Sequence, residues 1–196
     1  MANIKNPVTV VQSQKFKQMV DRSIVTIVDS DLIGITKIGD YGFAGCNQLI
    51  SVAIPNSITS FGYAVFYGCT GLMSITIPDS ITSIGSSAFQ NCSSLSSIII
   101  PNSISRIENS TFGGCTGLTS ITIGNGATFI GNNAFNNCRS LTGVTILATT
   151  PPILNNVNAF GSTNACPIYV PADSVAAYQA ATNWVDLASR IQAIPS

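Results

Sequence analysis

The chain has 196 residues, of which 45% are apolar, and this is enough to build the core of one ordinary domain or one compact repeat array. Only 8% of the residues are charged, and eight Lys and Arg balance eight Asp and Glu, which argues against a basic face for nucleic acid and against a polybasic membrane anchor. The sequence contains no histidine, so it lacks the usual general base near neutral pH and the commonest metal ligand. We therefore expect no enzyme, no metal and no cofactor.

Residues 1–34 are predicted to form an N-terminal cap. Nine charged residues fall within positions 1–40, whereas positions 41–147 contain four. A polar, irregular cover of this kind protects the exposed end of a stacked fold. The segment has no apolar core typical of a signal peptide, and no apolar run of about 20 residues occurs in the chain, so neither a leader nor a membrane span is expected and the export route stays open.

Two elements are expected within this cap. The spacing of Phe16, Met19 and Val20 predicts a short helix over the first coil, and residues 24–28 predict an edge strand. The pair Asp29 and Asp31 lacks the glycine and the distal glutamate of a calcium loop, so solvated cap charges are the favoured interpretation.

A 23-residue repeat organises residues 35–147. Each unit has a phenylalanine followed three residues later by a cysteine, then a leucine, a β-rich triplet and a second apolar pair. A 23-residue unit cannot offset its own conformational entropy of roughly 1 to 2 kcal/mol per residue, so the units must stack. The predicted fold class is a repeat solenoid with two short extended pieces and one helical or irregular turn per coil. The anchor positions are Phe43, Phe66, Phe89, Phe112 and Phe135, with Cys46, Cys69, Cys92, Cys115 and Cys138.

Parallel stacking at about 4.8 Å per coil would align equivalent residues in ladders. Alternation within the triplets directs Val52 and Ile54 into the core and leaves the intervening residues outside. The outer face is small, polar and almost uncharged, and we take it as the candidate binding surface. Its candidate binding residues are Ser74, Thr76, Ser97, Ile99, Ser120, Thr122 and Thr145.

The five in-register cysteines are predicted to be buried free thiols. A linear stack about 5 Å apart cannot bring four thiolates around one tetrahedral zinc. The same spacing exceeds the roughly 3.8 Å between Cβ atoms that a disulfide prefers. Cys166 lies outside the ladder, and its state is left open.

Residues 148–196 are predicted to form an atypical last turn and a cap helix. Pro151-Pro152 breaks the register, and Phe160 restores it two residues late. The helix is expected to have Asp173 or Ser174 as its N-cap, to end near Ala181, and to bury Val175 and Tyr178.

Other side-chain groupings give weaker signals. Asp79 and Glu108 lie on different repeats with no partner carboxylate at a repeated offset, which disfavours a glycosidase pair. Tyr63 and Tyr67 could form an aromatic contact patch on one edge or could be half-buried spacers, and the sequence favours neither.

The segment from Leu72 to Cys92, Leu-x-x-Ile-x-Ile-Pro-x-Ser-Ile-x-x-Ile-Gly-x-x-Ala-Phe-x-x-Cys, resembles the BspA-like leucine-rich repeats of bacterial surface proteins. The resemblance covers about residues 35–146, and the tail around 168–194 looks like the segment that often closes such arrays. It implies a curved leucine-rich-repeat solenoid used for adhesion or recognition, and it brings no family-wide binding residue. Departures from the pattern occur at Gly124, Ala127 and Glu108.

Two classes of function remain. The first is a recognition or adhesion module, outside the cell or at its surface, that binds a protein or glycan on a host or neighbouring cell. The second is a structural or receptor-binding part of a phage or injection particle, with residues 1–11 as a docking strand and with a homo-oligomer or larger assembly. Neither class involves nucleic acid or membrane insertion. The third possibility is that the serine and threonine ladders are only the solvated faces of a scaffold, with no ligand on this chain.

Overall fold

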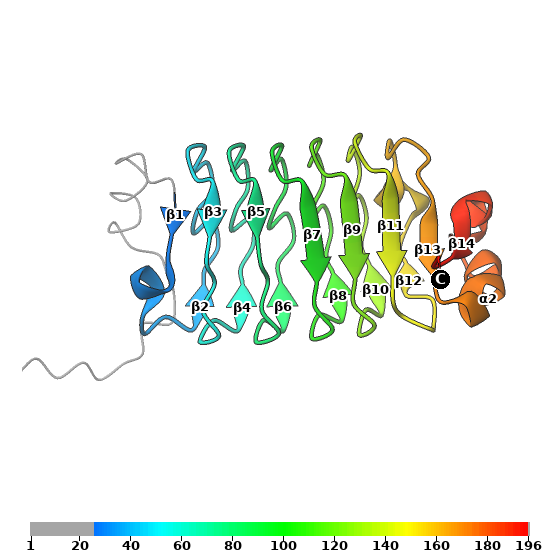
Figure 1. Ribbon diagram of the computed structural model, residues 1–196, viewed down its shortest axis with the longest axis horizontal. Coiled ribbons are helices and arrows are strands. Elements are labelled where there is room, and N and C mark those ends of the chain that lie inside the picture. Colours follow the sequence, from blue (N-terminus) through cyan, green and yellow to red (C-terminus); the bar gives the residue numbers. More distant parts are fainter. Residues whose placement is uncertain (1–25, 196) are drawn as a thin grey trace, which may run out of the picture.

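Each repeat in the computed structural model contributes two short strands joined by turns, and the structure describes residues 26–195. Equivalent strands of successive repeats lie side by side, so the chain coils into a solenoid with two columns of parallel strands (Figure 1). The predicted repeat solenoid with two extended pieces per coil is confirmed.

The first strand column forms the long row of arrows in Figure 1. It comprises β1 (Thr26–Ile27), β3 (Ser51–Val52), β5 (Ser74–Ile75), β7 (Ser97–Ile100), β9 (Ser120–Ile123), β11 (Gly143–Ile146), β13 (Ile168–Val170) and β14 (Ile191–Ala193). The second strand column comprises β2 (Lys37–Ile38), β4 (Ser60–Phe61), β6 (Ser83–Ile84), β8 (Arg106–Ile107), β10 (Phe129–Ile130) and β12 (Ile153–Leu154).

The strand register follows the repeat. Ser97 of β7 pairs with Ser120 of β9, at the full repeat spacing, and all paired strands are parallel. One extra residue enters after β11, since Phe129 of β10 pairs with Ile153 of β12. The register break predicted at Pro151-Pro152 therefore lies where the coil lengthens, and the strands still pair beyond it.

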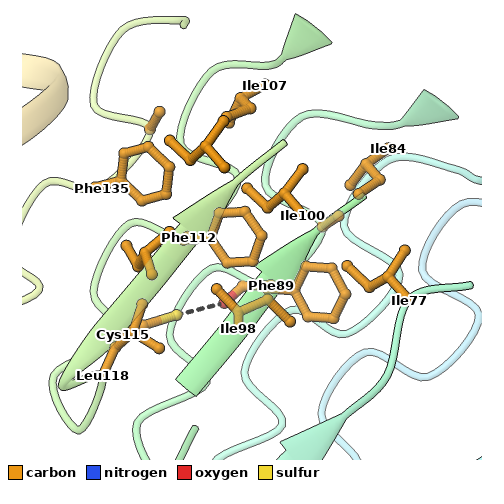
Figure 2. Close-up of a cluster of buried hydrophobic side chains, with 14 of the residues drawn as sticks. Ile77, Ile84, Phe89, Ile98, Ile100, Ile107, Phe112, Cys115, Leu118 and Phe135 are labelled. Atoms are coloured by element: carbon orange, nitrogen blue, oxygen red, sulfur yellow. Dashed lines mark hydrogen bonds between the residues drawn. The ribbon is translucent and has the colours of Figure 1, made fainter. Parts of the chain in front are cut away.

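Stacked phenylalanines form the centre of the core. Consecutive rings from Phe43 through Phe160 lie 5.2 to 5.5 Å apart between centroids and are nearly parallel. Figure 2 shows three of these rings with the isoleucines from both strand columns packed around them. Phe160 continues the ladder, as its late position predicts, so the last turn shares the core of the array.

The cysteine ladder adds hydrogen bonds to this core. All six cysteines are buried free thiols, Cys166 included. Four thiols each donate a hydrogen bond to the carbonyl of a phenylalanine in the preceding coil, and Figure 2 marks one of these bonds. The donor and acceptor pairs are Cys69 with Phe43, Cys92 with Phe66, Cys115 with Phe89 and Cys138 with Phe112, at 3.0 to 3.2 Å.

These bonds require protonated thiols, and burial favours the same state. Burial raises the pKa of the Cys92 and Cys138 thiols to about 12, and it raises the pKa of Cys115 as well. These four cysteines are therefore more than small apolar fillers, because each one also adds a hydrogen bond to a buried backbone carbonyl of the preceding coil.

Close stacking of the coils also depends on glycine. Gly62 follows β4 directly, and a Cβ atom at this position would lie 2.8 Å from the carbonyl carbon of Gly39 in the preceding coil. Real Cβ atoms do not approach so closely, so only glycine permits the observed spacing here.

The N-terminal end of the described chain contains β1, which falls inside the predicted edge strand 24–28, and the 3-10 helix η1 (Asp29–Leu32). The helix predicted around Phe16, Met19 and Val20 lies outside the described residues, as does the docking strand predicted at 1–11.

The C-terminal end is closed by short helices and by side chains that donate hydrogen bonds to backbone carbonyls of the last turn. Tyr178 is buried, and its hydroxyl donates to the Ala148 carbonyl at 2.8 Å. Trp184 Nε1 donates to the Pro152 carbonyl, and Asn183 Nδ2 donates to the Leu154 carbonyl, both at 2.7 Å. The helices are η2 (Val157–Phe160), η3 (Ala172–Ser174), α2 (Val175–Ala180) and η4 (Val185–Arg190).

The predicted cap helix needs one correction. It is present as α2, with Tyr178 buried and Val175 half-buried, but neither candidate residue caps it through a side chain. Ser174 precedes α2 with helical backbone angles, because the 3-10 turn η3 leads directly into the helix. A residue in this conformation is poorly placed to cap with its hydroxyl. Within residues 26–195, no helix is long and apolar enough to cross a bilayer.

Candidate binding surface

The structure places all seven candidate residues on the outer side of the first strand column. The strand pairings align Ser97 with Ser120 and Ile99 with Thr122, and Thr122 with Thr145. Ser74, Thr76, Ser97, Ile99 and Ser120 are exposed, while Thr122 and Thr145 are half-buried. We call the surface formed by these seven residues the open face.

A neighbouring set of hydroxyls shows what the open face lacks. Ser96, Thr119 and Thr142 stand one position before the strands, and each donates its hydroxyl to a backbone carbonyl of the preceding coil. Donor to acceptor distances are 2.9 Å for Thr119 to Ser96 and 3.0 Å for Thr142 to Thr119. We call these three residues the anchored row, because their hydrogen bonds join successive coils.

The hydroxyls of the open face are not used in this way. In the part of the chain that the structure describes, the six serine and threonine side chains of the open face make no hydrogen bond. These hydroxyls can therefore donate hydrogen bonds to a ligand, or accept them from one, without breaking a hydrogen bond of the fold.

The open face has one strongly apolar position near its centre. Ile99 is 69% exposed, although its neighbours Ile98 and Ile100 on β7 are buried. An exposed isoleucine surrounded by hydroxyls gives the face a small apolar centre within a polar rim, the arrangement common at the centre of protein interfaces.

A groove lies at the N-terminal end of the open face. It has a volume of about 360 Å³ and crosses β1, β3 and β5, with Ser74 and Thr76 of the open face among its lining residues. The candidates from β7, β9 and β11 lie outside the groove lining. The lining residues not singled out as candidates from the sequence include Thr26, Val28, Ser51 and Ala53.

Differences in side-chain size explain the position of this groove. In the outward row that contains Thr76, Ala53 leaves space between the neighbouring strands at the N-terminal end. Near the other end, the ring of Tyr169, which pairs with Thr145, fills the corresponding space and approaches Gly143. The alanine and the tyrosine were visible in the sequence and could have indicated where the face is hollowed.

The charges near the open face are sparse. Within residues 26–195, an ion pair joins Arg106 to Glu108 at 2.8 Å. It lies at the second strand column, where Arg106 also covers the Phe129 ring. A surface with so few charges offers shape and hydrogen-bonding groups and provides little electrostatic steering.

Comparison with known proteins was made on sequence and on structure. The model of the BspA type leucine-rich repeat region matches residues 36–165 in six copies. Among curated proteins, none matches the sequence.

Several solved structures resemble the chain. A leucine-rich repeat protein of T. pallidum has 25% sequence identity and a TM-score of 0.65, over 76% of this chain and 69% of that one. A leucine-rich repeat protein of Eubacterium ventriosum has 24% identity and a TM-score of 0.63, over 76% of this chain and 41% of that one. A leucine-rich repeat protein of Bacteroides ovatus has 26% identity and a TM-score of 0.52, over 82% of this chain and 52% of that one. The chain thus spans about half or less of the length of two of these three proteins.

Proposed function

Because the chain belongs to the BspA type leucine-rich repeat family, we propose that it is a non-enzymatic recognition module whose open face binds a protein on a host or neighbouring cell. The proposal implies that the chain acts outside the cell or at the cell surface. The observation that carries the proposal is a contrast between two sets of hydroxyl groups. The hydroxyls of the anchored row donate hydrogen bonds within the fold, and the hydroxyls of the open face do not.

The surface to which the open face belongs is large enough for a protein ligand. The first strand column, on which the open face lies, contains eight strands in residues 26–195, and at about 4.8 Å per strand they extend over more than 30 Å. A protein interface of ordinary size needs about 800 Å² on each partner, and a surface of this length can supply it. The apolar centre at Ile99 and the polar rim around it fit the same purpose.

The experiment is binding of the purified, labelled chain to a panel of matrix proteins, mucins and bacterial cells, with the molar mass of the same sample recorded in solution. The test variant is Thr76→Trp, which fills the groove and covers the neighbouring strands. The matched control is Thr116→Trp, since Thr116 is also exposed but stands in a turn outside both strand columns.

We expect saturable binding to a protein, at least about tenfold weaker for Thr76→Trp and unchanged for Thr116→Trp. Equal affinities for both variants would contradict the assignment to the open face. Binding to mucin glycans alone would contradict the choice of a protein ligand. A stable oligomer that binds nothing and dissociates when residues 1–11 are removed would overturn the proposal in favour of an assembly component.

A further inference from the structure

Three exposed tyrosines, Tyr41, Tyr63 and Tyr67, lie on the turns that follow β2 and β4. These turns are near the N-terminal end of the array (Figure 1). The exposed fractions are 58% for Tyr41, 44% for Tyr63 and 41% for Tyr67. The rings of Tyr41 and Tyr63 meet edge to face, with centroids 5.2 Å apart and planes at 78°. We call these three residues the tyrosine patch, and it lies outside both strand columns.

The phenol of Tyr41 is close enough to the other two phenols to be affected by them electrostatically. Partial desolvation raises the pKa of the Tyr41 phenol, and the nearby phenols of Tyr63 and Tyr67 and the Asp40 carboxylate raise it further. Backbone bonds hold the turns in place, since Tyr41 N donates to the Tyr63 carbonyl at 2.8 Å and Gly45 N donates to the Tyr67 carbonyl at 2.7 Å.

The fold does not need tyrosine at these positions. Later repeats carry small or polar residues in the same register, and the coils stack there equally well. The equivalents are Ser87 and Ser110 for Tyr41, Ser86 and Asn109 for Tyr63, and Gln90 and Gly113 for Tyr67.

The backbone makes Tyr41 the least expected of the three. Its φ of 57° is left-handed, and the equivalent positions in the array share this conformation, with φ of 52° at Ala64, 58° at Ser87 and 56° at Asn133. Asparagine and small residues tolerate this region better than a bulky aromatic residue. A tyrosine that is both strained and exposed contributes little to folding, which indicates a role at the surface.

The area of the patch favours a compact ligand. With roughly 200 Å² for a whole aromatic side chain, the exposed parts of the three tyrosines sum to about 300 Å². This is well below the roughly 800 Å² per partner of a stable protein interface, so the patch alone is too small to hold a second copy of the chain or another folded protein.

The chemistry of the patch favours an uncharged ligand that carries many hydroxyls. The two turn segments, residues 39–48 and 62–70, contain a single charged residue, Asp40. Its Oδ1 accepts a hydrogen bond from Tyr63 N at 2.8 Å, and its exposed carboxylate repels acidic ligands. Aromatic faces pack against the C–H surfaces of a sugar ring, and phenol and carboxylate oxygens bond to its hydroxyls.

We propose that the tyrosine patch is a binding site for a neutral glycan. Tyr41 and Tyr63 supply two ring surfaces set at a steep angle, and Tyr67 extends the patch along the turn that also carries Tyr63. The site is separate from the open face and does not rest on the function proposed for it, so the two proposals can fail independently.

The test uses chitohexaose, mannohexaose and cellohexaose as neutral probes and sialyllactose as an acidic probe, each titrated into the full chain by calorimetry and ligand-observed NMR. The test variant combines Tyr41→Ser, Tyr63→Ser and Tyr67→Gln, which are the residues that the array itself carries two repeats or one repeat later. The control is Tyr169→Ala, because Tyr169 is a half-buried tyrosine of the first strand column.

We expect at least one neutral hexasaccharide to bind, with affinity lowered at least about tenfold in the triple variant and unchanged in Tyr169→Ala, while sialyllactose does not bind. Unchanged melting temperatures would show that the triple variant is folded. The proposal is overturned if no neutral hexasaccharide binds at millimolar concentration, if the triple variant binds as well as the parent chain, or if Tyr169→Ala alone abolishes binding.

Discussion

The anchored row and the open face contain the same residue types at adjacent positions of the same repeat, yet they have different roles. Thr119 donates its hydroxyl to the Ser96 carbonyl of the previous coil, whereas the hydroxyl of the next residue, Ser120, makes no hydrogen bond to any residue in 26–195. The comparison teaches that a periodic hydroxyl is not by itself a sign of binding. Its hydrogen-bond partners decide whether it holds the coils together or is available to a ligand.

The largest loss of stability is expected for substitutions in the phenylalanine ladder, which lies on the inner side of the coils whose outer side forms the open face. Phe112→Ala removes a fully buried ring that stacks between Phe89 and Phe135. We expect a loss of about 3 to 5 kcal/mol in the free energy of unfolding, because a cavity remains in the ladder. Denaturant unfolding measures it, and a loss below 1 kcal/mol would contradict the packing described above.

A second contrast concerns the C-terminal end, where side chains replace the missing next coil. Trp184→Phe keeps an aromatic ring but removes the indole donor that binds the Pro152 carbonyl. We expect a loss of about 2 kcal/mol, since this buried carbonyl becomes unsatisfied and the smaller ring leaves space. Thermal melting of the variant tests this, with Val185→Ala as the control at an exposed neighbour. Equal melting temperatures for the two variants would argue against the cap.

Because of the buried thiols, we expect the free energy of unfolding to depend on pH in the alkaline range, whereas the hydroxyls of the open face add no such dependence. Cys92 has a folded-state pKa of about 12, compared with 9.0 for an ordinary thiol. Between these values the folded state binds more protons than the unfolded state, so stability is complete below about pH 9 and falls as the pH rises toward 12.

The slope from this one thiol is at most about 1.4 kcal/mol per pH unit. Denaturant midpoints at pH 8, 9 and 10 should decline less steeply for Cys92→Ala than for the parent chain, whatever the absolute stability of the variant. Parallel declines would show that the Cys92 thiol does not titrate with unfolding.

The smallest expected effect separates the two hydroxyl sets directly. Thr119→Val removes a hydrogen bond between coils and should cost about 1 kcal/mol, whereas Ser120→Ala should change the free energy of unfolding by less than about 0.5 kcal/mol. Both are measured by denaturant unfolding under the same conditions. A larger loss for Ser120→Ala would mean that the open face is a structural surface.

The sequence was sufficient to predict the solenoid, its two strand columns and the inward direction of the ladders, because an uninterrupted period leaves few alternatives for stacking. The placement of Ile99 and its neighbours on the outer side followed from strand alternation. The role of those residues in binding is still a prediction.

Other features depend on three-dimensional contacts that a period does not contain. The bonds from the thiols to phenylalanine carbonyls join residues 26 positions apart, which is not the repeat length. The contact of Tyr41 with Tyr63 depends on a left-handed turn at Tyr41 that its residue type does not favour. The direct passage of η3 into α2 made the predicted side-chain cap unnecessary.

The most direct test of the central claim compares two isoleucines that differ in location but hardly in exposure. Ile99 of the open face is 69% exposed, and Ile153 of β12 in the second strand column is 70% exposed. The measurement is the affinity of Ile99→Arg and Ile153→Arg for the protein identified by the binding panel. We predict at least about tenfold weaker binding for Ile99→Arg and none of this loss for Ile153→Arg. Equal affinities, or a loss confined to Ile153→Arg, would contradict the assignment of binding to the open face.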